Sequence, residues 1–199
     1  MKTVLAAALL LTLGLASQQA NAAGPVPRNM GEFTMATPAG AKISISSYKG
    51  KVMVVQFLSV TCPHCQKFSQ TLTKLMGDPD LKGFQPLGCA FDEGIKPENV
   101  NSYVSTYKVG MPVGYSDRTK VLGYLGISVM ERIGVPQIVI IDKKGQIRAQ
   151  TDSDGGGKLS DEIYLKAYIT SLLKEGSAGP ASKATPAAKA KAPKVKDGD

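Results

Sequence analysis

The sequence predicts an α/β domain in which a mixed central β-sheet carries helices on both of its faces. Three observations support this prediction. A β-rich apolar run at residues 52–58 leads directly into a segment with helical spacing, strand-like and helix-like patterns then alternate, and a hairpin pattern followed by one more helix closes the domain. Alternation of this kind is typical of sheets that are covered by helices on both sides.

The central strand is predicted at residues 52–58. Its sequence "VMVVQFL" is continuously apolar apart from one Gln, as expected of a strand that is buried on both faces. Just upstream, Ile43 and Ile45 indicate a short edge strand, and "SYKGK" indicates a turn.

The first helix is predicted from Cys62 to about Met76. Pro63 suits a first helical turn because its missing N–H has no partner there, and Gly77 suits the end of the helix. The residues that should form its buried stripe are Phe68, Leu72, Leu75 and Met76.

The second half of the domain continues the alternation of strands and helices. The predicted elements are a strand at 84–91, a helix at 96–110 with Val100, Tyr103, Val104 and Tyr107 on its inner side, a helix from its cap Asp117 to about Arg132, a strand at 136–142, its hairpin partner at 146–151, and a helix from its cap Ser160 to Lys174. The last helix is expected to bury Ile163, Ala167 and Leu173.

The two ends of the chain differ from this domain in composition. Residues 1–22 resemble a secretory signal, because Lys2 precedes an apolar run too short to span a bilayer and a small-x-small pattern, Ala20-Asn21-Ala22, follows. We therefore expect an exported, periplasmic protein that is soluble after cleavage and whose folded domain spans 23–175. Residues 176–199 are rich in Ala, Pro and Lys and predict a disordered tail.

The net charge of +8 does not indicate a nucleic-acid-binding protein. Part of this charge falls in the predicted signal and tail, and no predicted helix carries a basic stripe. Export argues against nucleic acid as a partner as well. Export also places the cysteines in an oxidising compartment, where disulfides form and persist.

The segment "CPHC" contains Cys62, Cys65 and His64, which is the only histidine of the chain. A zinc site is disfavoured because it needs about four ligands and only Cys89 remains to complete one. A structural disulfide would close a very short loop and would constrain the unfolded chain little. The spacing is therefore best explained by a redox pair.

The position of the pair at a strand–helix junction suits this chemistry. Cys62 should lie at the N-terminus of the helix, where unpaired N–H groups and the helix dipole favour the thiolate. His64 lies in the same turn and can stabilise that sulfur further. Cys65 is placed to form the disulfide and to resolve a mixed intermediate.

These segments resemble the thioredoxin fold. The similarity rests on three features: "VVQFLSVTCPHC", "GVP" before an apolar strand, and the final hairpin and helix. The N-terminal extra strands of the periplasmic TlpA/ResA-like branch resemble a further segment of this chain, "GEFTMATPAGAKISISSYKGKV". The resemblance implies that Val135-Pro136 is a cis peptide beside the cysteines and that its backbone binds an extended substrate segment. The Pro-His dipeptide between the cysteines is similar to that of DsbA-like oxidants.

The sequence also departs from the family pattern. Thr61 stands where Trp commonly precedes the first cysteine, Gln56 aligns with the buried acid of thioredoxins, and Phe68 stands where ResA-like reductases often carry Glu. A proton acceptor for Cys65 must then come from elsewhere, and Glu93, or its neighbour Asp92, is the candidate relay. Cys89, in the predicted strand at 84–91, is expected to be a buried, inert thiol.

The sequence therefore predicts an exported thiol–disulfide oxidoreductase without a cofactor. Its expected partners are protein thiols or disulfides, with apocytochrome c among the candidates, and a membrane thiol reductant or oxidant. Whether it reduces or oxidises its substrates is left open. The alternatives are a copper(I) carrier that binds through the two thiolates, and a thiol peroxidase, for which Ser59 fits loosely but Val55 occupies the place of the expected proline.

Overall fold

The computed structural model describes residues 24–175. Eight strands form one mixed sheet in the order β1-β8-β7-β4-β5-β6-β2-β3. The strands are β1 (Arg28–Asn29), β2 (Thr34–Ala36), β3 (Lys42–Ser44), β4 (Val52–Leu58), β5 (Phe84–Ala90), β6 (Val113–Tyr115), β7 (Gln137–Ile141) and β8 (Gln146–Gln150). The predicted mixed sheet with additional N-terminal strands is confirmed.

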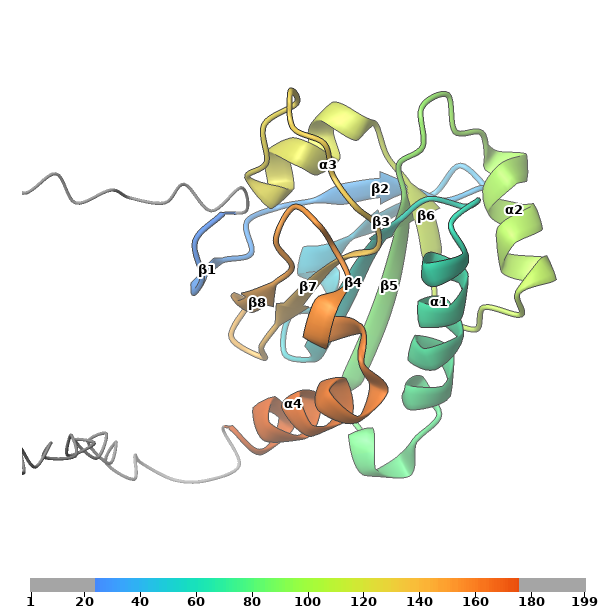
Figure 1. Cartoon of the computed structure of the whole chain (residues 1–199). Helices are drawn as coiled ribbons and strands as arrows, with labels where there is room; N and C mark the ends of the chain where they lie inside the picture. The colour runs from blue at the N-terminus through green and yellow to red at the C-terminus, as the bar shows by residue number, and fades with distance from the viewer. Residues whose placement is uncertain (1–23, 176–199) are drawn as a thin grey trace, which may run out of the picture.

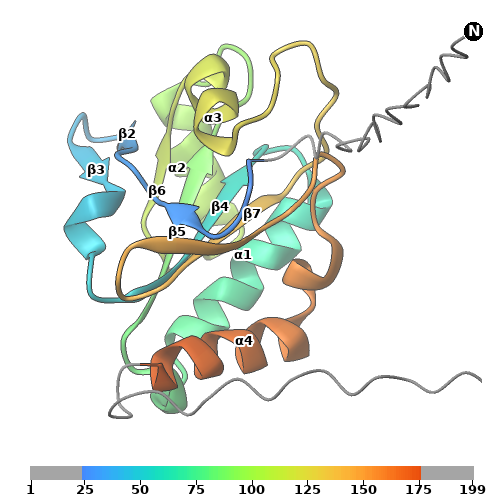
Figure 2. The same cartoon turned by 90° about the vertical axis from the view of Figure 1, so that its left-hand side faces the viewer.

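Helices cover both faces of this sheet (Figures 1 and 2). The α-helices are α1 (Pro63–Met76), α2 (Pro97–Thr106), α3 (Arg118–Leu125) and α4 (Glu162–Lys174), and the short 3-10 turns are η1 (Ile45–Tyr48), η2 (Pro79–Leu81) and η3 (Gly157–Ser160). One core cluster joins the inner sides of α1, α2 and α4 to the sheet, and a second joins α3 and the N-terminal segment to the opposite face. No helix among residues 24–175 has the length and apolar character needed to cross a bilayer.

Strand β4 lies at the centre of the sheet, as its sequence predicts. It pairs in parallel with β5 and antiparallel with β7, and every one of its side chains is buried. Because β4 and β5 run in parallel, the loops that follow them emerge at the same edge of the sheet. These loops lead into α1 and α2, so the cysteine pair lies where ligand sites of α/β sheets commonly form.

Two predictions in the middle of the chain need correction. The helix expected to extend from Asp117 to about Arg132 ends at Leu125, because Gly126 adopts the left-handed conformation with a φ of 70° and terminates it. The sequence analysis also missed β6, whose three residues pair with β5 and β2. A strand this short shows no alternating pattern that could identify it.

The inner face of α4 was also predicted wrongly. Its N-cap is Asp161, which accepts the Tyr164 N–H, while Ser160 ends the preceding 3-10 turn. The residues buried are Leu165, Ile169 and Leu172, whereas Ile163 is 82% exposed, Ala167 is exposed and Leu173 is half-buried. The helix buries its other apolar stripe because Leu165 and Leu172 present more apolar surface than Ile163 and Ala167 do.

Smaller differences concern two further residues. Met76, expected in the buried stripe of α1, is 38% exposed at the last turn of the helix. Ile43 belongs to β3, but Ile45, expected in the same strand, begins η1 and is buried. The predicted signal at residues 1–22 and the predicted tail at residues 176–199 lie outside the described residues.

The turn between β7 and β8 is organised by the nearly buried carboxylate of Asp142. The carboxylate accepts the N–H groups of Lys144 at 2.9 Å and Gln146 at 3.0 Å, and it pairs with Arg148 at 3.0 Å. Arg148 also pairs with Glu175 beyond the end of α4, at 2.6 Å, so the hairpin and the last helix are connected. Burial raises the pKa of Asp142, but hydrogen bonds from Gln146, Arg148 and Lys144 outweigh it and hold that pKa below its usual value.

We predict that Asp142→Asn lowers the free energy of unfolding at pH 7 by about 1–2 kcal/mol. Because the pKa of Asp142 is lowered by folding, its carboxylate contributes fully to the free energy of unfolding above about pH 4. This contribution is lost as the pH falls through the pKa of Asp142 in the folded protein. The difference between variant and wild type, measured by urea denaturation, should therefore shrink below about pH 4. Asp80→Asn, at an exposed position, is the control; an equal loss there, or a difference for Asp142→Asn independent of pH, would contradict the prediction.

Candidate functional site

Cys62 occupies the N-cap of α1, as the sequence predicts. Its backbone is extended, with φ of −81° and ψ of 118°, and Pro63 begins the helix. The Cys62 side chain makes no capping hydrogen bond, so the free N–H groups of the first turn remain available to a negative charge. The Cys62 residue is half-buried, so part of it contacts solvent.

Cys65 lies in the same turn but is fully buried. Burial raises the pKa of the Cys65 thiol well above its usual value; a hydrogen bond from the Ser59 backbone opposes the shift, and the Cys62 side chain adds to it. Both thiols are free in this structure. The two thiols therefore differ in their surroundings. Cys62 is partly accessible at the N-terminus of the helix, whereas Cys65 is buried behind it and held protonated.

A network of buried polar side chains holds the backbone carbonyl of Cys65. Gln56 on β4 donates its amide to that oxygen at 2.9 Å, and the Tyr103 hydroxyl on α2 donates to it at 3.0 Å. Ser69 connects the two, since its hydroxyl donates to the Gln56 side-chain oxygen at 2.8 Å and lies 2.7 Å from the Tyr103 hydroxyl. Gln56, which aligns with the buried acid of thioredoxins, is thus a neutral residue that fixes the first turn of α1.

The Val135-Pro136 peptide is cis, which confirms the expectation from the resemblance. It lies directly beside the cysteines, because the Cys62 sulfur donates to the Val135 carbonyl oxygen at 3.7 Å. Val26-Pro27 is also cis, which the sequence did not indicate.

Residues 152–157 pack closely against this proline segment. Gly134 N–H donates to Ser153 at 2.7 Å, and Gly156 N–H donates to Pro136 at 2.8 Å. A Cβ at Gly134 would lie 1.9 Å from the Asp154 carbonyl oxygen, so the two backbones approach at a distance that only glycine allows. We call residues 152–157 the glycine loop.

The buried side chain of Gln137 fastens the glycine loop to the proline segment. Its amide donates to the carbonyls of Gly134 and Asp152, each at 2.9 Å, and its oxygen accepts the Thr151 hydroxyl at 2.7 Å. The sequence analysis missed this residue. The available signal was a polar side chain at the start of the apolar run "QIVII", since a buried amide needs hydrogen-bond partners.

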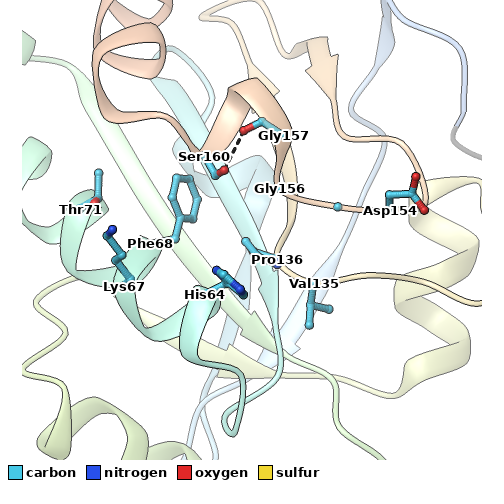
Figure 3. A pocket seen from close by; sticks show the side chains of 11 residues that line it. His64, Lys67, Phe68, Thr71, Val135, Pro136, Asp154, Gly156, Gly157 and Ser160 are labelled. Carbon is cyan, nitrogen blue, oxygen red and sulfur yellow. Dashed lines mark hydrogen bonds between the residues drawn. The ribbon is translucent and has the colours of Figure 1, made fainter.

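A groove of about 370 Å³ opens beside the cysteines, between α1 and the glycine loop (Figure 3). His64 and Lys67 lie on the α1 side, and Pro136 lies opposite them. The groove is lined by His64, Lys67, Phe68, Thr71, Val135, Pro136, Asp154, Gly155, Gly156, Gly157 and Ser160. Phe68, at the position where ResA-like reductases often carry Glu, contributes an aromatic ring to this lining.

The structure brings most of the predicted site residues together, with Glu93 as the exception. Cys62 and Cys65 share one helical turn, Cys62 contacts Val135, and His64, Val135 and Pro136 line the groove. Glu93 is exposed and lines a separate hollow with Tyr115 and Arg118. Its neighbour Asp92 is half-buried and accepts the Val60 N–H at 3.0 Å, and its charge contributes to the raised pKa of Cys65.

The third thiol lies apart from this site. Cys89 is fully buried in the core cluster on the α3 side of the sheet, and burial raises its pKa far above the usual value. Within residues 24–175 no group of three His, Cys, Asp or Glu side chains is placed to hold a metal ion. The copper(I) hypothesis thus relies on the two thiolates of Cys62 and Cys65, and it stays a prediction.

Comparison with known proteins agrees with this geometry. A model of the "AhpC/TSA family" matches residues 26–150. The chain is 25% identical over 118 residues to "Thiol-disulfide oxidoreductase ResA" from Bacillus thuringiensis (strain Al Hakam), which covers 59% of this chain and 64% of that protein. The chain thus spans less than two thirds of the length of this curated relative.

Solved structures show the same fold. The thioredoxin domain of a thiol–disulfide oxidoreductase from Bacteroides vulgatus superposes with a TM-score of 0.57 at 21% identity, covering 73% of this chain and 96% of that one. A thiol:disulfide interchange protein from Bacteroides sp. superposes with a TM-score of 0.59 at 22% identity, covering 76% of this chain and 94% of that one. The fold is therefore thioredoxin-like.

We predict that iodoacetamide modifies Cys62 of the reduced protein at pH 7 and leaves Cys65 and Cys89 unmodified. The reason is that Cys62 is reachable, whereas burial both covers the other thiols and raises their pKa. Peptide mass spectrometry after a short reaction identifies the labelled residue. Protein unfolded in guanidinium, in which all three thiols should react, is the control; labelling of Cys65 as fast as Cys62 in the folded protein would contradict the prediction.

Proposed function

The chain belongs to the AhpC/TSA family, and on that premise we propose that it is a thiol–disulfide oxidoreductase acting through the Cys62/Cys65 pair. The observation that carries the proposal is the unequal placement of the two thiols. Cys62 lies half-exposed at an uncapped helix N-terminus beside the cis peptide, and Cys65 lies buried one turn behind it. The ResA-named relative, a thiol–disulfide oxidoreductase, supports the same activity.

In the reductive direction, the Cys62 thiolate attacks one sulfur of a substrate disulfide. A mixed disulfide forms between Cys62 and the substrate, and the second substrate sulfur leaves as a thiolate. Cys65 then loses its proton and attacks the Cys62 sulfur. The Cys62–Cys65 disulfide forms, and the first substrate sulfur leaves as a thiolate. Oxidation of a substrate dithiol is the reverse of these steps, and the reduction potential of the pair decides which direction dominates.

The proton of Cys65 needs an acceptor, because burial keeps this thiol protonated near neutral pH. The sequence analysis named Glu93 or Asp92 for this role. The contacts favour Asp92, which is half-buried and hydrogen-bonded to Val60, two residues before Cys62. Glu93 faces solvent, and its role as a relay stays a prediction.

The remaining groups of the site have binding and tuning roles in this proposal. Among the described residues, the Val135 carbonyl accepts only the long contact from Cys62, so it is free to pair with an extended substrate backbone. His64 follows Cys62 in the first turn of α1, and its imidazole can stabilise the Cys62 thiolate, and therefore the reduced protein, by positive charge or by a hydrogen bond.

The setting that we propose for this activity is outside the cytoplasm. The signal-like residues 1–22 support export, and an exported oxidoreductase exchanges thiols with secreted proteins. Its partners would be protein thiols or disulfides, with apocytochrome c as one candidate, and a membrane protein that resupplies or removes electrons.

We predict that Cys62→Ala abolishes disulfide exchange, because no other accessible thiol exists in the described residues. Reduction of insulin by dithiothreitol in the presence of the variant should fall to the uncatalysed rate. Cys65→Ser should instead accumulate a mixed disulfide with substrate, since the resolving thiol is gone. Cys89→Ala is the matched control and should retain the wild-type rate, because Cys89 is in the core on the opposite face of the sheet.

Undiminished exchange in Cys62→Ala would rule out the proposal. Rapid turnover of hydrogen peroxide without exchange on disulfides would favour the thiol peroxidase. Stoichiometric copper after growth with copper, again without exchange, would favour the copper(I) carrier.

We predict that His64→Pro makes the pair more reducing. Loss of the imidazole removes a group that can stabilise the thiolate by charge or by a hydrogen bond, and so shifts the equilibrium toward the disulfide. Titration against glutathione should show the equilibrium constant moving by about tenfold, which corresponds to ~30 mV. His64→Ala, which leaves the backbone of Pro63 unrestricted, should move the constant in the same direction. No movement in either variant would contradict the tuning role.

A further inference from the structure

The groove beside the cysteines has an uncompensated basic side. His64 and Lys67 project from neighbouring turns of α1 along the same wall (Figure 3). Both are exposed, and none of the ion pairs among residues 24–175 involves either of them. By contrast, Lys74 on the same helix and Lys166 on α4 are paired with Glu162 and Asp78.

The single carboxylate of the groove lies away from this basic side. Asp154 belongs to the glycine loop and lies at the opposite end of the groove from Lys67 (Figure 3). None of the ion pairs among residues 24–175 joins Asp154 to Lys67 or His64. A ligand in the groove meets positive charge along α1.

The floor of the groove is apolar, and its opposite wall is fixed in place. Phe68 and Pro136 are almost completely buried and still line it. The glycine loop is held by the hydrogen bonds of Gly134, Gly156 and Gln137, so this wall is formed before any substrate binds. Gly157 leaves open space, since a Cβ at this position would meet no atom within 4 Å.

We propose that this groove selects an extended substrate segment that carries acidic side chains next to its cysteine. The acidic side chains would lie against His64 and Lys67, and an apolar side chain would cover Phe68 and Pro136. The inference rests on the proposed function and names its substrate class. A volume of about 370 Å³ is within the range of ligand pockets, and it suits a short peptide better than one side chain.

The magnitude of the preference follows from the exposure of the two basic side chains. Exposed charge pairs each contribute modestly, and they act mainly on encounter and binding. We therefore expect kcat/KM for an acidic peptide to exceed that for a basic one by about fivefold at low salt. The ratio should approach one at high salt, because ions screen exposed charges.

The test uses three peptides of equal length, each with one central cysteine flanked by Glu, Gln or Lys. Reduced full-length protein is mixed with the symmetric disulfide of each peptide, and oxidised protein with each reduced peptide, so that either direction of exchange is observed. Loss or gain of protein thiols gives the rate. We expect the order Glu, then Gln, then Lys in whichever direction exchange proceeds.

Charge reversal at Lys67 is the decisive variant. Lys67→Glu should invert the order of the peptides, and Lys82→Glu should leave it unchanged. Lys82 is an exposed lysine between η2 and β5, outside the groove lining, and its replacement changes the net charge by the same amount. An unchanged order in Lys67→Glu, or an equal response in Lys82→Glu, would overturn the proposal.

A small neutral substrate separates this inference from the proposed function. 2-Hydroxyethyl disulfide and its thiol reach Cys62 without occupying the groove. If neither exchanges with the protein, the proposed function itself fails. If they exchange normally while the three peptides react at equal rates, the proposed function stands and the acidic preference is wrong.

Discussion

The geometry of the site depends on two buried glutamines that lie on neighbouring strands and face opposite sides of the sheet. Gln56 on β4 points toward α1 and donates to the Cys65 carbonyl, while Gln137 on β7 points the other way and donates to Gly134 and Asp152. The antiparallel pairing of β4 with β7 sets Gln137 opposite Phe57, the residue after Gln56. A buried amide costs free energy unless it is hydrogen-bonded. Each amide therefore holds its own side of the site, the first turn of α1 or the cis-proline segment.

This arrangement also determines where charge can exist around the cysteines. Gln56, Ser69 and Tyr103 satisfy one another and the Cys65 carbonyl without a formal charge. The buried network beneath the pair thus contributes no carboxylate, and Asp92 accepts a hydrogen bond from Val60 in the loop that precedes Cys62. The buried thiol is held protonated by desolvation, whereas the exposed one faces free N–H groups. The two sulfurs differ in reactivity because their surroundings differ.

Features whose signal is local in the sequence could be predicted. The strand–helix junction at "TCPHC" and the Val-Pro segment carry their geometry in a few adjacent residues, and both cis peptide and N-cap were found as expected. The roles of the glycine loop and of Gln137 could not be predicted, because both depend on contacts with Gly134 that form only in the folded chain. The inner face of α4 was wrong for a related reason: the helix has two apolar stripes, and packing selects between them. Gln56 is buried, but its role could not be predicted because its partners on α1 and α2 lie far along the chain.

The basic side of the groove links substrate selection to the reactivity of Cys62. His64 and Lys67 line the groove next to the helix N-terminus that carries Cys62, and in our proposal they bind the acidic side chains of the substrate. When such a segment docks, its carboxylates neutralise part of the positive charge that the sulfur faces. A less stabilised thiolate is a stronger nucleophile, because nucleophilicity rises with basicity. In this proposal an acidic substrate segment thus increases the reactivity of the sulfur that attacks it.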